Sequence, residues 1–255
     1  MSRSTLLRLA AIMIALSAVM SVVLLQFDWF GDAASEEAGP IDTLFDVMVV
    51  LSSFVFSIVL VMFFYAIWRY RAKPGDESDG EPIHGNTKLE IAWTVIPTVI
   101  VLFGAAYSWI ILDDIEEVAP ASERMAVNVT AQQFKWTFEY PDEGVTADEL
   151  HVPVGKQLDI RLTALDVLHS FWVPEWRIKR DAVPQGAGGD EVDDEVQVTP
   201  DVEGTYNVVC AELCGVGHST MRALAVVESQ EEFDAWIDEQ KATQTPAPEE
   251  GGAAQ

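Results

Sequence analysis

Three long apolar runs lie in the first 112 residues of the chain. They cover Leu6–Phe27, Leu44–Trp68 and Ile91–Leu112. Each is longer than the roughly 18–20 residues that a helix needs to cross a bilayer. Pro97 interrupts the third run, and in a membrane-spanning helix we expect it to kink the helix without ending it. The pattern therefore predicts a transmembrane helical hairpin within residues 40–112, with spans at about 44–68 and 91–112.

Basic residues set the predicted orientation of this hairpin. Arg69, Arg71 and Lys73 follow the second run directly, so the positive-inside rule places that end of the span in the cytoplasm. The loop of residues 28–43 carries only acidic charges and is expected outside. The third run then returns outward, which leaves the rest of the chain on the exterior face of the cell membrane.

The first run, with Arg3 and Arg8 at its basic start, allows two interpretations for residues 1–30. A basic start followed by an apolar stretch is typical of a signal peptide. The stretch is long for that purpose, however, and no clean small-x-small cleavage site follows Phe27. We favour a cleaved signal peptide, with an additional transmembrane helix as the alternative, and both place the remaining chain on the same side.

From residue 113 onward the pattern changes to short alternating segments. Hydrophobic residues recur at every second position, between turn segments such as Pro141–Gly144 and Pro153–Gly155. The alternating positions are Val127 and Val129; Leu158, Ile160 and Leu162; Val196 and Val198; Tyr206, Val208 and Cys210; and Leu224 and Val226. Short strands at this spacing predict an all-β sandwich or barrel over residues 113–241. Glu231–Lys241 has helical spacing, and the acidic tail 242–255 is expected to be disordered.

Composition narrows the class of protein further. The chain has 41 acidic and 15 basic residues, a formal charge of −26, yet 49% of its residues are hydrophobic. An apolar fraction this high excludes a disordered acidic chain, and the negative charge excludes nucleic acid as a partner. Two cysteines are too few for a disulfide-stapled mini-protein. The composition fits a protein anchored in a lipid bilayer with a strongly acidic exterior part.

A loop near the C-terminal end carries most of the candidate chemistry. Within twelve residues it places two thiols, an imidazole and a thioether, which are Cys210, Cys214, His218 and Met221. His169 lies 41 residues before the first cysteine. Soft sulfur ligands with imidazole favour copper, whereas zinc seldom uses methionine. A single blue-copper site needs one cysteine, so two thiolates suggest two metals that share them; a disulfide is the plain alternative.

At these residues the sequence resembles subunit II of the haem–copper terminal oxidases, the cytochrome c oxidase type. The resemblance covers about residues 40–240 and rests on the hairpin, the cysteine loop and two motifs, Asp166–Pro174 and Lys179–Pro184. It implies a membrane-anchored all-β protein, with a cupredoxin-like Greek-key sandwich preceded by the transmembrane helical hairpin. The strand pattern agrees with that fold.

The family's metal site is the binuclear CuA centre, and the resemblance implies a full ligand set for it. The two bridging thiolates, two terminal imidazoles, axial thioether and axial backbone carbonyl would come from Cys210, Cys214, His169, His218, Met221 and Glu212. The Glu212 carboxylate would also help to bind a magnesium ion at the contact with the catalytic subunit. Without the resemblance, this acid would be interpreted as an ordinary solvent-exposed residue.

Further positions match the family or depart from it. Glu90 resembles the carboxylate at the cytoplasmic mouth of a proton path; an acid stabilised by a helix N-terminus is the alternative. Trp136 belongs to the aromatic stretch near the copper, although aromatic residues on strands usually only pack. Phe134 stands where the family commonly has the tryptophan that receives electrons, so we expect electrons to enter at Phe134 and Trp136 by a route that departs from the family's. Gln185–Asp190 follows Pro184, where Gly-Arg is common.

The resemblance predicts a subunit of a respiratory oxidase that is not catalytic alone. It would take electrons from cytochrome c or a blue copper protein and pass them through CuA to haem in subunit I. That partner, in a complex with other oxidase subunits, would reduce dioxygen to water and pump protons. The alternatives are a membrane-tethered copper carrier, a quinol oxidase subunit that has lost its copper, and the copper domain of nitrous oxide reductase.

Charge on the exterior part bears on the origin of the protein and on its donor. Residues 113–255 contain 30 acidic and nine basic residues, a net charge of −21. The acids are dispersed and do not gather near the cysteine loop, which predicts adaptation to high salt in a halophilic archaeon. Because the screening length at molar salt is about 3 Å, donor docking would depend on short-range contact near Phe134 and Trp136.

Overall fold

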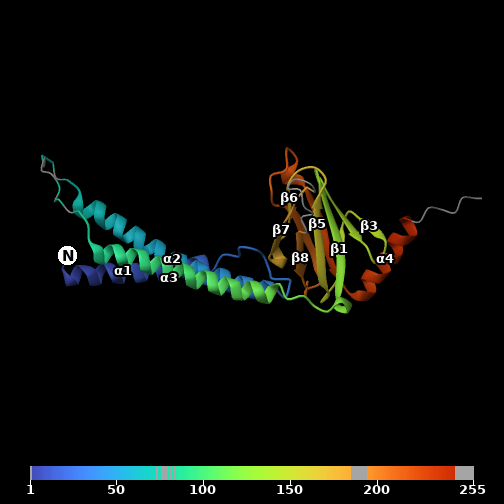
Figure 1. Cartoon of the computed structure of the whole chain (residues 1–255), viewed down its shortest axis with the longest axis horizontal. Helices are drawn as coiled ribbons and strands as arrows, with labels where there is room; N and C mark the ends of the chain where they lie inside the picture. Colours follow the sequence, from blue (N-terminus) through green and yellow to red (C-terminus); the bar gives the residue numbers. More distant parts are fainter. Residues whose placement is uncertain are drawn as a thin grey trace, which may run out of the picture. The chain divides into compact units, whose positions relative to one another are not determined.

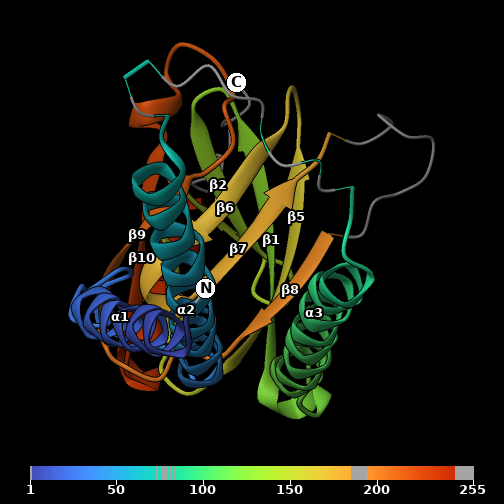
Figure 2. The ribbon, with the colours of Figure 1, turned by 90° about the vertical axis from the view of Figure 1, so that its left-hand side faces the viewer.

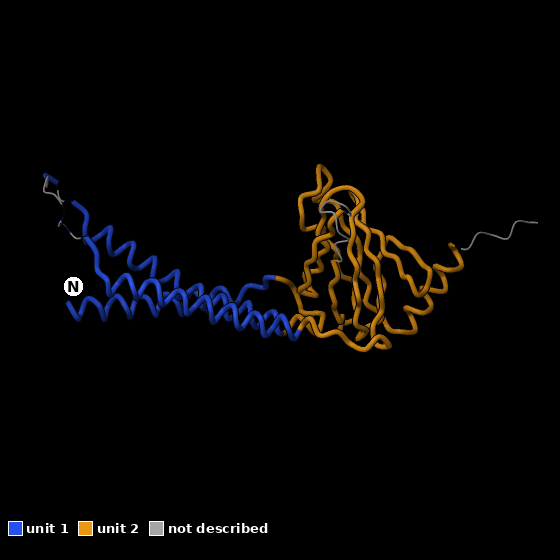
Figure 3. The backbone as a smooth tube through the Cα atoms, in the orientation of Figure 1, with its two compact units in different colours: residues 1–29, 40–114 blue, residues 30–39, 115–255 orange. Residues whose placement is uncertain are grey.

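The computed structural model describes residues 2–72, 74–75, 80, 82, 84–184 and 194–244. The chain divides into two compact units (Figure 3). The helical unit comprises residues 1–29 and 40–114, and the β unit comprises residues 30–39 and 115–255. The β unit is therefore built from two separate stretches of the sequence.

Three apolar helices form the helical unit: α1 (Arg3–Leu24), α2 (Ala38–Tyr70) and α3 (Thr87–Ile115). All three are long and apolar enough to cross a membrane. α3 continues through Pro97, so this residue does not end the helix. Many large apolar side chains of these helices are exposed, which fits contact with lipid. Lys73, which contributed to the predicted orientation, lies outside the described residues.

In the described part of the β unit, strands form two five-stranded sheets (Figure 1). The strands are β1 (Arg124–Gln132), β2 (Lys135–Tyr140), β3 (Val145–Ala147), β4 (Leu150–Pro153), β5 (Gln157–Ala164), β6 (His169–Val173), β7 (Ile178–Ala182), β8 (Asp194–Val198), β9 (Gly204–Cys210) and β10 (Arg222–Glu228). The sheet orders are β3-β2-β1-β5-β8 and β4-β10-β9-β6-β7. Figure 2 gives a second view, with β9 and β10 at one flank and β8 at the other. The predicted sandwich is thus observed.

Three single-turn 3-10 helices and one α-helix complete the β unit as described. They are η1 (Ala121–Glu123), η2 (Pro174–Trp176), η3 (His218–Thr220) and α4 (Gln230–Gln244). η2 joins β6 to β7, and η3 lies in the loop between β9 and β10. η3 carries the candidate ligand His218, and η2 contacts the distant Ala34 through the Glu175 carbonyl.

Alternating side chains of the two sheets form one hydrophobic core. In β5, Leu158, Ile160 and Leu162 are buried as their period-2 spacing predicts. The predicted alternation in β10 is wrong: Leu224 is exposed, whereas its smaller neighbour Ala225 faces the core. Packing of the sheet against its neighbours, and not side-chain size, decides which face of a strand is buried.

α4 corrects the predicted end of the β unit. It extends to Gln244, so residues 242–244 are helical and do not belong to a disordered tail. The Gln244 side chain accepts a hydrogen bond from the Thr146 backbone N–H (3.1 Å) and donates one to the Thr146 carbonyl (2.7 Å). This contact fastens the last turn of the helix to β3. Residues 245–255 lie outside the described residues.

Candidate metal centre

The loop between β9 and β10 is closed by backbone hydrogen bonds. The Cys210 N–H, at the end of β9, donates to the Met221 carbonyl just before β10 (3.2 Å). The Ala211 N–H donates to the Ser170 carbonyl of β6 (2.9 Å). These two bonds bring the loop's sulfur atoms beside the start of β6, which is the position of His169.

Two free, buried thiols lie at the centre of the loop. The Sγ atoms of Cys210 and Cys214 are 3.8 Å apart. A disulfide bond has an S–S length of about 2.05 Å, so the cysteines are not bonded to each other. The Sδ atom of Met221, which is fully buried, lies 3.8 Å from the Cys214 sulfur.

The two histidines lie on either side of this sulfur pair. His169 Nδ1 is 3.8 Å from the Cys210 Sγ atom, and His218 Nδ1 is 3.7 Å from the Cys214 Sγ atom. The backbone carbonyl of Glu212 is 3.3 Å from the Cys210 sulfur. The ligand atoms of His169, Cys210 and Cys214 all lie within 4.8 Å of one another, close enough to hold a metal ion. The structure thus brings together all six groups that the resemblance implied as ligands.

The charge state of the thiols indicates what would stabilise this arrangement. Burial raises the pKa of the Cys214 thiol to about 11, and the adjacent Cys210 sulfur adds to the shift. Two thiolates at this separation repel each other in a buried site, so both can ionise only with positive charge between them. A soft cation held by the sulfur and imidazole groups would supply that charge, and the donor set fits copper.

Asp166 holds His169 in place, a role that the sequence interpretation missed. His169 Nε2 is 2.8 Å from the Asp166 carboxylate, so this nitrogen carries the proton and Nδ1 presents its lone pair to the sulfurs. Burial opposes ionisation of Asp166, but hydrogen bonds from His169 and the N–H groups of Gln133 and Val167 outweigh it and lower the pKa of the carboxyl. An acid three residues before a candidate histidine ligand was the available signal.

Gln133 and Phe134 pack against the loop from the turn between β1 and β2. The Gln133 side-chain amide donates to the Cys214 carbonyl. A Cβ atom at Gly217 would lie 2.6 Å from ring carbons of Phe134, and one at Gly215 would lie 2.8 Å from the Gln133 amide. The loop therefore needs glycine at both positions, because these side chains occupy the space.

Trp136 occupies a different environment from the one predicted for a donor contact. It is 1% exposed, and its ring lies edge-on to His169 at a centroid distance of 6.3 Å and to Phe171 at 5.8 Å. A docked protein cannot touch this ring directly, so a donor that docks nearby would contact its neighbours, while electron entry near Phe134 and Trp136 stays a prediction. Its neighbour Phe134 is half-buried and lies at the edge of the loop.

The predicted acidic residues lie apart from the thiols. The Glu212 carboxylate is 3.5 Å from Lys179 Nζ, while its backbone carbonyl faces the sulfur pair. Glu90 lies in the first turn of α3, where its carboxylate accepts the Asn86 N–H (3.0 Å) and the Asn86 side chain accepts the Leu89 N–H (3.2 Å). This reciprocal pair caps the helix. Gln185–Asp190 lies outside the described residues.

Comparison with known proteins identifies the family. Residues 22–111 match the transmembrane domain of cytochrome c oxidase subunit II, and residues 145–229 match the periplasmic domain of the same subunit. The chain is 32% identical to cytochrome c oxidase subunit 2 of Thermostichus vulcanus, over 90% of this chain and 86% of that one. This chain belongs to the cytochrome c oxidase subunit II family.

Other members and a solved structure give similar matches. Subunit 2 from Synechocystis sp. is 31% identical, over 96% of this chain and 85% of that one. The periplasmic domain of subunit II of cytochrome oxidase from Bradyrhizobium japonicum is 26% identical, with a TM-score of 0.45, over 51% of this chain and all of that one. Membership confirms the predicted fold class, apolar helices followed by a cupredoxin-like sandwich, and the enzyme class, a subunit of an oxidoreductase complex.

Proposed function

We propose that this subunit II carries a binuclear CuA centre and is the point at which electrons enter a respiratory oxidase. It would pass them to haem in subunit I, for reduction of dioxygen to water coupled to proton pumping. The observation that supports this proposal best is the set of six donor groups around two sulfur atoms 3.8 Å apart. When bound there, two copper ions would supply a one-electron relay.

The residues of the chain would hold this centre rigid and dry. His169 and Met221 are fully buried, and both cysteines are 3% exposed. Asp166 fixes the imidazole of His169, and Gln133 fixes the carbonyl beside the second thiol. Ligands held by hydrogen bonds from a second layer of residues keep their orientation when the charge of the metal changes.

The electron donor would dock at the tip of the loop. Leu213 is 81% exposed and Val216 is fully exposed, on either side of Cys214. Exposed apolar residues of this kind mark a contact site for another protein, here cytochrome c or a blue copper protein. An apolar contact keeps its strength when salt screens the dispersed acids, so we also propose that the protein works at high salt in a halophilic organism.

Two acidic residues would serve the contact with subunit I and the proton path. With the β unit outside and the α2–α3 connection in the cytoplasm, Glu90 would lie at the cytoplasmic start of α3 and pass protons toward subunit I. The Glu212 carboxylate would exchange its ion pair with Lys179 for a magnesium ion when subunit I binds. Both roles add to the electron-transfer function and do not depend on each other.

Electron paramagnetic resonance of the copper-loaded full-length chain in detergent tests the ligand assignment. We expect a purple protein with the seven-line pattern of one unpaired electron shared by two coppers. Cys210→Ser and Cys214→Ser should each abolish that pattern, because each removes a thiolate that both metals need. His151→Gln is the matched control, since His151 stacks on Trp236 and contacts none of the six ligands. A four-line pattern in the parent protein, or unchanged spectra in both serine variants, would contradict the proposal.

A further inference from the structure

Ten residues, Phe30–Gly39, make up most of the α1–α2 connection and the first two residues of α2. They belong to the β unit and not to the helical unit. We call this segment the clasp. Its residues Ala34 and Ala38 are 2% and 0% exposed, and Ala34 is part of the hydrophobic core of the sandwich. Ser35 forms an isolated β-bridge with Pro200. The clasp is therefore an integral element of the β unit.

Hydrogen bonds to backbone carbonyls tie the clasp to both sheets at the end of the sandwich away from the cysteine loop. At η2, which follows β6, the Ala34 N–H donates to the Glu175 carbonyl (2.9 Å) and the Ser35 hydroxyl donates to the Trp176 carbonyl (3.0 Å). After β8, the Glu36 N–H donates to the Thr199 carbonyl (3.0 Å). One segment thus fastens the end of one sheet to the end of the other.

Two charged side chains complete this attachment. Glu37 is 8% exposed, and the Thr199 N–H lies 2.9 and 3.0 Å from its two carboxylate oxygens. Arg177 donates to the carbonyls of Phe30 (3.2 Å) and Gly31 (2.8 Å), and its guanidinium lies 5.2 Å from the centre of the Phe30 ring. Glu37 is buried and Arg177 is half-buried. Because charge removed from water is costly unless it is hydrogen-bonded, these contacts specify the position of the clasp.

Within the helical unit, α1 packs along α2 through small polar residues. Ser17 and Ser21 of α1 and Ser53 and Ser57 of α2 are all at most 9% exposed. The Ser57 hydroxyl lies 3.7 Å from the sulfur of Met20 on α1. Small residues let membrane helices approach closely, and hydroxyl groups bond across the interface. The described residues of α3, by contrast, include none that are buried.

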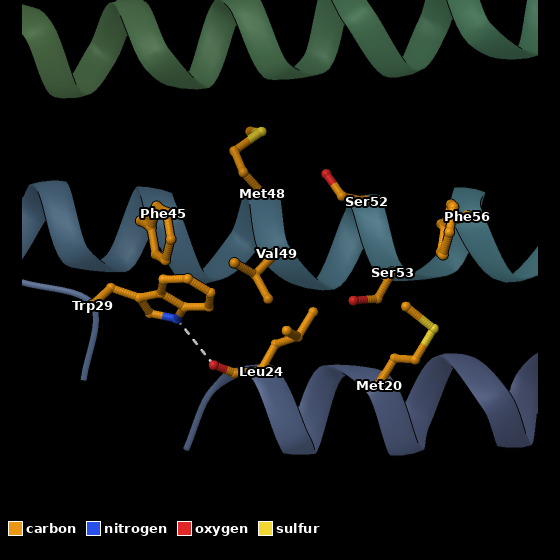
Figure 4. Close-up of a pocket in the computed structure, with 9 residues that line it drawn as sticks. All are labelled: Met20, Leu24, Trp29, Phe45, Met48, Val49, Ser52, Ser53 and Phe56. Atoms are coloured by element: carbon orange, nitrogen blue, oxygen red, sulfur yellow. Dashed lines mark hydrogen bonds between the residues drawn. The ribbon is translucent and has the colours of Figure 1, made fainter. Parts of the chain in front are cut away.

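Large side chains continue the same interface at the end of α1. Met20 and Leu24 point toward Val49 and Ser53 of α2 across a groove of about 450 Å³ (Figure 4). The Trp29 indole donates to the Leu24 carbonyl (3.0 Å) and lies edge-on to Phe45 of α2, with the ring centres 6.0 Å apart. α1 therefore has a specific face that matches α2 from Ser17 to its C-terminal end.

We propose that the first apolar run is a permanent third membrane span, and that the clasp after it remains part of the folded protein. A signal peptide needs only an apolar stretch of roughly 7–15 residues and no partner helix. Here a 22-residue helix buries serines against α2, and the next segment completes the sandwich. Cleavage at or after the clasp would remove part of the β unit, and cleavage before it would remove a packed helix. For residues 1–30 we therefore propose the additional transmembrane helix in place of the cleaved signal peptide. Neither observation depends on the copper assignment.

Intact-mass measurement of the protein, purified from native membranes through a C-terminal tag, tests this proposal directly. We expect a chain that begins at Met1 or Ser2. A chain that begins anywhere between residues 25 and 40 would overturn the proposal.

Two leucine substitutions in α1 give a second test, which does not depend on the measured mass of the purified chain. Ser21→Leu places a large side chain in the interface with α2, whereas Val22→Leu changes a residue that is 63% exposed. We expect Ser21→Leu to lower the Tm of the full chain in detergent by several degrees and Val22→Leu to leave it unchanged. A cleaved signal peptide would tolerate both changes equally, so equal Tm values would overturn the proposal.

The clasp is tested in the same assay by removing its main side-chain anchor. Arg177→Ala should lower the Tm, because the Phe30 and Gly31 carbonyls lose their donor. Arg161→Ala is the control, since it removes only an exposed ion pair with Glu195. If both variants melt at the parent's temperature, the clasp does not stabilise the folded protein.

Discussion

At the scale of single residues, Asp166 is expected to affect the metal site although it is not one of the candidate ligands. Its carboxylate receives three hydrogen bonds, from the His169 ring and from the N–H groups of Gln133 and Val167. Asp166→Asn keeps the size of the side chain but removes the charge that holds the imidazole proton on Nε2. We expect copper affinity to fall by roughly 10–100-fold, the usual effect of losing such a partner.

Competition with a copper chelator measures this change in the full-length chain. Glu139→Gln serves as the control, since Glu139 is an exposed acid on β2 whose side chain contacts Asn128 and no candidate ligand. A chelator curve for Asp166→Asn that matches the parent would show that His169 is held by other contacts.

Gly217 leads to a second prediction at this scale. Gly217→Ala places a methyl group on the Phe134 ring, so the ring or the loop must move. Overpacking of this kind costs roughly 1–3 kcal/mol of unfolding free energy. Phe134→Ala in the same chain opens the space, and we expect the double variant to lose less stability than the sum of the two single variants. Thermal unfolding of the parent, the two single variants and the double variant measures this coupling. If the stability losses of the two single variants simply add up in the double variant, the prediction is contradicted.

Much of the site could be predicted at the residue scale, because metal ligands are few and chemically distinctive. Two thiols, an imidazole and a thioether in one short loop are typical of a binding site for a soft metal ion. Asp166 and Gln133 could not be predicted in the same way, because carboxylates and amides are common on any surface. Only the fold places one beside His169 and the other beside Cys214.

At the scale of elements, the sequence predicted the kind of structure better than its boundaries or faces. α2 begins at Ala38, six residues before the apolar run, because Gly39 and Pro40 are tolerated in the first turn of a helix. β10 was correctly predicted as a strand, but the prediction that its Leu224 side chain faces the core was wrong. The clasp was interpreted as an acidic loop, since nothing in its own sequence shows that the Glu37 carboxylate accepts a hydrogen bond from the Thr199 N–H.

At the scale of the whole molecule, the charge of −26 and the exposed apolar tip of the loop predict how the rate of donor oxidation depends on salt. Steering by charge is lost when the screening length falls to about 3 Å. An apolar contact persists, so we expect the oxidation rate to change little between low and molar salt while the fold remains intact. A rate that falls steeply over this range would show that docking depends on the acids instead.

Aspartate substitutions separate the docking site from the rest of the surface in the same assay. Val216→Asp at the tip of the loop should slow donor oxidation at all salt concentrations. Val202→Asp is the matched control, because Val202 is also exposed (46%) but lies in the turn before β9, at the opposite end of that strand from Cys210. Equal rates for the two variants would exclude the loop tip as the docking site.

The clasp also has a consequence for how the protein is made. It leaves the ribosome early, but its partners Trp176 and Thr199 follow 141 and 162 residues after Ser35 and Glu37. At a synthesis rate of about 5–20 residues per second, roughly 8–30 s pass between synthesis of the clasp and synthesis of these partners. The sandwich can pack against the clasp only after that interval. Two hydrophobic segments must be inserted during that interval. The assembly of the β unit is therefore coupled to membrane insertion, and a delay in either step leaves an unpaired edge exposed to misfolding.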